Sequence, residues 1–157
     1  MKTPKTKPLD WDAMPPGERA VAVAKDVIAQ LKRKAFVATP NTYLFHDGDI
    51  SHLMPEDDLR AHLAELGNCK VCAKGAIFLC SVRLFDQVTV GNNDSLYNSR
   101  VVWDLFGDDA NSIEYAFEGW NDDYTPEREF YAAHPDPKRR LIAIMQNIIE
   151  HDGRFVP

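Results

Sequence analysis

Three cysteines lie close together in this chain, at positions 69, 72 and 80. A Cys69-x-x-Cys72 pair can bind zinc or exchange disulfides, and a cysteine at a helix start has its thiolate favoured by the helix dipole. Cys72 precedes an apolar stretch, so it is a candidate nucleophile with His134 or His151 as the candidate general base. The alternative is packing, because free cysteine is among the residue types most often buried.

A metal site is the next chemistry to consider. A structural zinc ion takes four ligands, usually from two cysteine pairs, and this chain has one such pair. Residues 46–52 place two His and two Asp within seven positions, but a polar Asp-Gly turn explains the same residues. A divalent ion there would also need a ligand from elsewhere in the fold. We therefore expect no bound metal and no cofactor.

The most uneven charge lies in residues 104–129, which carry nine Asp and Glu against the single Arg128. If the helices point these side chains outward together, they form an acidic face that attracts a protein partner with a basic surface. The alternative is an ordinary solvated surface, where charge runs are usually found. The candidate partner-binding residues are Asp104, Asp108, Asp109, Glu114, Glu118 and Asp122.

A second charged group is Lys138, Arg139 and Arg140, directly after Asp136-Pro137. Asp followed by Pro is a typical helix start, with Asp as the N-cap. The free N–H groups of a helix start, together with three cations, would bind a small anion such as a nucleotide phosphate. The alternative is that Asp136 and neighbouring acids offset these cations.

The elements that position these groups are mostly helices. Apolar residues recur at three- and four-residue spacing, which predicts helices over about 18–34, 55–66, 69–85, 96–106, 112–120 and 137–152. The helix over 69–85 is apolar all round at 76–80, so we expect it to be central, and we place Trp120 on an inner face. β-branched and aromatic residues around Pro40-Asn41 predict a short hairpin or an extended pair near 36–45.

Length and composition complete the prediction of fold class. At 157 residues the chain suits one compact, mainly α domain of five to six helices over 15–157, with residues 1–14 as a disordered basic tail. No apolar run approaches the length of a membrane span, and no export signal follows the N-terminus, so we expect a cytoplasmic protein with reduced cysteines. The net charge of −6 argues against a nucleic-acid partner.

Two stretches resemble known families. Val71-Cys72-Ala73-Lys74-Gly75-Ala76-Ile77, the later Trp120-Asn121-Asp122 and an apolar C-terminal helix resemble a family of small bacterial and phage proteins with no established activity. That resemblance implies a bacterial cytosol or a phage genome, and no mechanism. The string from Cys69 is similar over four or five residues to the helix-start cysteine of papain-like hydrolases, without the aromatic residue that follows that cysteine.

Three functions therefore stay open. The first is a non-enzymatic interaction protein, such as a phage-encoded or mobile-element-encoded modulator of a host protein, acting through the acidic face. The second is a binder of a small molecule or nucleotide at Lys138–Arg140. The third is a hydrolase with Cys72 as its nucleophile.

Overall fold

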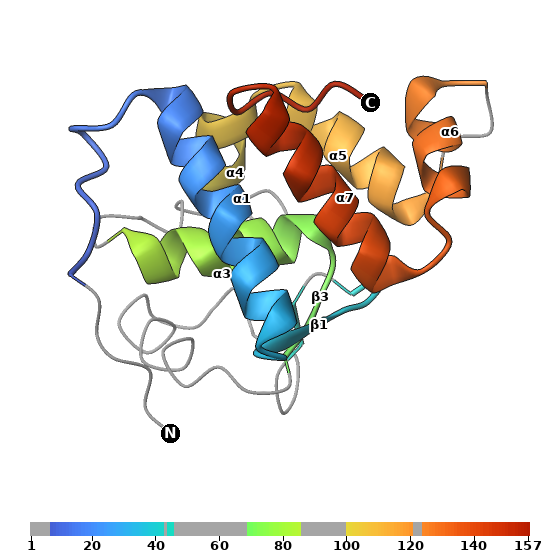
Figure 1. Ribbon diagram of the computed structural model, residues 1–157, viewed down its shortest axis with the longest axis horizontal. Helices are drawn as coiled ribbons and strands as arrows, with labels where there is room; N and C mark the ends of the chain where they lie inside the picture. Colours follow the sequence, from blue (N-terminus) through green and yellow to red (C-terminus); the bar gives the residue numbers. More distant parts are fainter. Residues whose placement is uncertain (1–6, 43, 46–68, 86–99, 121–123) are drawn as a thin grey trace.

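The structure is a computed structural model that describes residues 7–42, 44–45, 69–85, 100–120 and 124–157. It confirms the mainly helical fold class with a small β element. The described helices are α1 Pro16–Lys32, α3 Ala73–Leu84, α4 Arg100–Phe106, α5 Asp109–Glu118, α6 Pro126–Ala133 and α7 Pro137–Glu150 (Figure 1). The described strands are β1 Phe36–Ala38, β2 Leu44–Phe45 and β3 Cys69–Val71.

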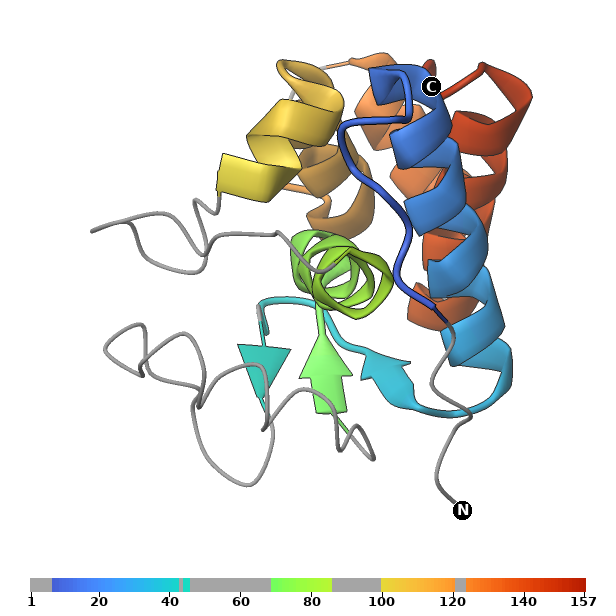
Figure 2. The same ribbon diagram turned by 90° about the vertical axis from the view of Figure 1, so that its left-hand side faces the viewer.

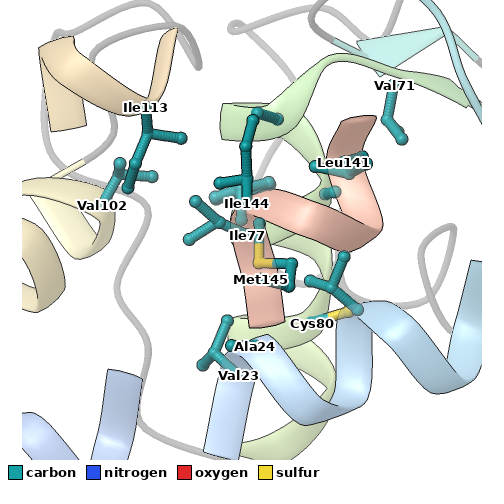
Figure 3. Close-up of a cluster of buried hydrophobic side chains, with 14 of the residues drawn as sticks. Val23, Ala24, Val71, Ile77, Cys80, Val102, Ile113, Leu141, Ile144 and Met145 are labelled. Atoms are coloured by element: carbon teal, nitrogen blue, oxygen red, sulfur yellow. The ribbon is translucent and has the colours of Figure 1, made fainter. Parts of the chain in front are cut away.

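Helix α3 runs through the middle of the fold, as its apolar sequence predicts. Every residue from Ala73 to Ser81 is buried. Figure 2 looks along this helix, with the strands on one side and the other helices around the rest of it. The side chains of α3 meet α1, α5 and α7 in one apolar core, part of which Figure 3 shows with Val23, Ala24, Ile77, Cys80, Ile113, Leu141, Ile144 and Met145.

Of the two alternatives near residues 36–45, the structure has the extended pair, β1 and β2, and not the hairpin. Strand β3 lies between β1 and β2, parallel to β1 and antiparallel to β2, so β1 and β2 do not pair with each other. Cys69 and Val71 face the core while Lys70 is exposed, the two-residue alternation of a strand. The prediction of a helix from Cys69 is therefore wrong over residues 69–72, and α3 begins only after Cys72.

The helix starts follow the sequence closely in the last third of the chain. Thr125 and Asp136 cap α6 and α7, accepting hydrogen bonds from the backbone N–H groups three residues on, at 3.3 Å and 2.9 Å. A proline follows each cap, and the start of α7 at Asp136-Pro137 is the one predicted above. Helix α5 instead begins at Asp109, a little before the predicted start.

Residues 9–14 contact the rest of the fold. Leu9 N–H donates to the carbonyl of Leu84 at 2.8 Å, and the Trp11 ring packs edge-on against Phe85 at 4.9 Å. The Arg19 guanidinium lies 4.5 Å from the centre of the Trp11 ring. Residues 9–14 are therefore held on the end of α3, which corrects their assignment to a disordered tail.

Helices α1 and α3 also share a polar contact that the apolar pattern does not reveal. Arg83 Nε donates to Asp26 Oδ2 at 2.8 Å, and Arg83 Nη2 contacts Asp26 Oδ1. The side-chain amide of Gln30 donates to the same carboxylate at 3.1 Å. Asp26 and Gln30 are buried, so these bonds satisfy polar groups that would otherwise destabilise the core. This network explains why a charged residue sits on the inner face of α1.

Several predictions lie outside the described residues. These are the helix over 55–66, the candidate metal residues at 46–52 and Asp122. Among the described helices, none is long and apolar enough to cross a membrane.

Candidate functional site

Cys72 occupies the junction between β3 and α3, where it is the N-cap residue with extended backbone. Burial is the main cause that raises the pKa of this thiol to about 12. The charges of Glu118 and Glu114 act in the same direction, and the N–H groups of Gly75 and Lys74 oppose them. At neutral pH the group is therefore a protonated thiol. This environment is the opposite of the one that activates a catalytic cysteine.

The other two cysteines do not complete a redox or zinc site with Cys72. Cys69 and Cys72 are three positions apart in extended chain, so their Cα atoms are about 10 Å apart, beyond the reach of a disulfide. Cys80 lies on α3 in the core, where burial and the neighbouring Asp26 raise its thiol pKa. Within the described ranges, no three His, Cys, Asp or Glu side chains gather as a metal site would require.

His134, the candidate base, ends helix α6. Its Nδ1 lies 2.9 Å from the carbonyl of Phe130, and its ring packs on the Phe130 ring at 4.6 Å. Its backbone carbonyl accepts from Arg140 at 2.8 Å. These contacts fix the imidazole in the turn between α6 and α7 through Nδ1.

The predicted acidic face is largely taken up by internal contacts. Glu114 and Glu118 do lie one turn apart, but their shared side of α5 turns inward. The Glu114 carboxylate is 2.6 Å from Lys74 Nζ, and the two side chains are only 8% and 4% exposed. Glu114 is therefore corrected from a surface residue to one half of a buried ion pair, because α5 packs against the start of α3.

Asp109 is engaged as well. Arg154 donates two hydrogen bonds to its carboxylate, from Nε at 2.7 Å and from Nη2 at 3.2 Å. The backbone N–H of Phe155 donates a third at 3.2 Å. The Arg154 hydrogen bond lowers the pKa of Asp109, and the Phe155 N–H lowers it further against the effect of burial. This carboxylate fastens the C-terminal segment to α5.

Glu118 is half-buried and belongs to a different contact. Its Oε2 accepts from the backbone N–H of Asn41 at 2.8 Å, and the indole N–H of Trp120 donates to Asn41 Oδ1 at 3.2 Å. Burial raises the pKa of Glu118, and Glu114 raises it further, while the Asn41 N–H and Arg140 lower it. These bonds join the segment after β1 to the end of α5.

The predicted anion site does not assemble. Lys138 and Arg139 are exposed, but Arg140 is only 1% exposed and points into the protein. Its guanidinium lies 4.3 Å from the Tyr131 ring centre and 5.1 Å from that of Phe117, and it donates to the carbonyls of His134 and Pro135. Asp136 already occupies the N-terminus of α7, so the three cations do not converge on one anion.

Two features of the surface were missed in the sequence. Trp120, expected in the core, is 48% exposed, while Trp103 and Tyr115 are each 38% exposed. Asp104 and Asp108, on and after α4, are exposed alongside them. A helical stripe in the sequence shows which positions share a face, but an aromatic residue just beyond a helix end has no such signal.

The buried thiols lead to a direct prediction. In native protein at pH 8, all three cysteines should react with a disulfide reagent at least about a hundredfold more slowly than in urea-unfolded protein, because each is buried. Rapid labelling of Cys72 in the native protein would contradict this and favour the hydrolase.

Above pH 9 the free energy of unfolding should fall, since the unfolded chain loses the Cys72 proton before the native state does.

Asp109 gives a prediction on the acid side. Its pKa is lowered in the native state, so its bonds stabilise the fold above about pH 4 and are lost as the pH falls through the native pKa. The urea midpoint of the wild type should therefore be higher than that of Asp109→Asn at pH 7. The difference between the two midpoints should shrink below pH 4. A difference that stays constant with pH would show that the carboxylate charge is not involved.

No protein-family model matches the sequence, and neither characterised proteins nor solved structures show significant similarity to it.

Proposed function

We propose that this chain is a non-enzymatic interaction protein that binds a partner with a basic surface. The contact surface is the α4–α5 face, which we define as Trp103, Asp104, Asp108, Asn111 and Tyr115. All five are exposed; Asp108 lies between α4 and α5, the others lie on these two helices, and the helices pack against each other. This proposal keeps the predicted type of partner but moves the contact away from the buried Glu114.

The observation that carries the proposal is the exposure of Trp103 and Tyr115 beside two acids. Each of these aromatic side chains is 38% exposed, although both lie on helices whose other large apolar residues are buried. Aromatic residues are enriched where proteins bind each other, and acids around them steer a basic partner into place.

The contacts of the other candidate groups favour binding over catalysis. The pKa of the Cys72 thiol is raised to about 12, which disfavours a thiolate nucleophile at neutral pH. Arg140 is buried between aromatic rings, which disfavours a nucleotide at the start of α7. The resemblance to bacterial and phage proteins favours a partner in a bacterial cell, such as a host protein that this chain modulates.

A photo-crosslinking residue tests the proposal. Placed at Tyr115 in protein expressed in bacteria, it should give one dominant protein adduct, while the same residue at exposed Lys25 on α1 should not. With that partner purified, Asp104→Lys and Asp108→Lys together should slow association about tenfold and change dissociation much less. Equal adducts from both positions, or unchanged association, would overturn the proposal.

A further inference from the structure

Trp120 is an exposed side chain whose backbone and ring are both fixed by contacts with other residues. Gly119 ends α5 with φ +73°, and a Cβ there would lie 2.7 Å from the Tyr131 ring, so only glycine fits this approach. Arg128 donates to the Gly119 carbonyl at 2.7 Å. The backbone that leads into Trp120 is therefore fixed from two sides.

The indole ring is fixed as well, through Asn41. The Trp120 N–H donates to the Asn41 side-chain oxygen at 3.2 Å, and the Asn41 backbone N–H is bound by Glu118 at 2.8 Å. Asn41 adopts φ +58°, a left-handed conformation that is costly for most residues and tolerated best by Gly and Asn. A half-buried carboxylate and a costly backbone conformation thus serve to orient an indole that is 48% exposed.

Other aromatic rings of this protein are covered by arginine side chains. Arg19 lies over Trp11, and Arg140 over both Tyr131 and Phe117. Among the described residues, no arginine or lysine covers Trp120 in the same way. The indole is the strongest cation-binding ring among the side chains, and a guanidinium also stacks flat on it.

We propose that Trp120 is the anchor point at which the partner presents an arginine side chain, with Asn41 and Glu118 holding the indole ready for it. The inference rests on the proposed function and adds the residue type that is recognised. Glu118 and Trp120 both bond to Asn41, so a carboxylate lies close to the ring and complements the cation. A preoriented ring binds more tightly because less side-chain freedom is lost on association.

The test uses the indole N–H resonances of Trp11, Trp103 and Trp120, assigned by single Trp→Phe variants. The probe is the peptide acetyl-(Gly-Arg)4-amide, with citrulline and lysine counterparts as controls of matched length. The arginine peptide should shift the Trp120 resonance saturably. The affinity of the citrulline peptide should be lower by about tenfold or more. The lysine peptide should also bind more weakly, because it does not stack.

The matched variant is Asn41→Gly, which accepts the positive φ and removes the amide side chain, including the oxygen that accepts from Trp120. It should melt with the wild type and bind the arginine peptide about three- to tenfold more weakly. Equal shifts at all three indoles, equal binding of the lysine peptide, or unchanged binding by Asn41→Gly would each overturn the inference. If the peptide test fails while the Tyr115 adduct still forms, the inference is wrong and the proposed function stands.

Discussion

Replacing Glu114 by alanine is expected to lower the free energy of unfolding by about 3–5 kcal/mol, the largest effect of any single exchange considered for this protein. The carboxylate is buried and 2.6 Å from Lys74 Nζ, and the exchange leaves that ammonium charge in a buried position. The loss should appear as a lower midpoint in urea unfolding with an unchanged slope.

The control is the double variant Glu114→Leu with Lys74→Met. Replacing both partners of a buried ion pair by apolar residues of similar size is often close to neutral, because no charge is left without its partner. The double variant should therefore be markedly more stable than Glu114→Ala. A single variant as stable as wild type would place Glu114 in solvent and return it to the acidic face.

The second large effect is expected for Gly153→Ala, just after α7. Gly153 has φ +97°, and a Cβ there would lie 2.7 Å from the Gly17 carbonyl oxygen and 2.8 Å from its Cα. Both contacts are with backbone, so the C-terminal segment must move away from the start of α1. Together with the cost of the backbone conformation, we expect a loss of about 3 kcal/mol in the free energy of unfolding.

Gly107→Ala is the matched control for this prediction. Gly107 also has a positive φ, +52°, but its Cβ would meet nothing within 4 Å. This exchange should cost only the left-handed conformation, about 1–2 kcal/mol. Equal losses for the two variants in urea unfolding would show that the contact between Gly153 and Gly17 contributes nothing.

Much of the helical part of the fold could be read from the sequence because its signals are local. The apolar stripe of α1, the all-round apolar stretch of α3 and the caps at Thr125 and Asp136 each depend on residues a few positions apart. The strand at Cys69–Val71 could not be read in this way. Three alternating residues next to a helix carry too little periodicity, and β3 is defined by its pairing with β1 and β2.

The same difference between local spacing and tertiary packing applies to the candidate site. The sequence by itself determined that α5 carries Glu114 and Glu118 on one face, that an apolar stretch follows Cys72 and that cations follow Asp136. Only the tertiary structure decided that this face turns towards Lys74 and Asn41, that the thiol is buried and that Arg140 points into the protein. The physical reason is that spacing along a helix sets which side chains share a face, whereas the packing of other helices decides which face meets water.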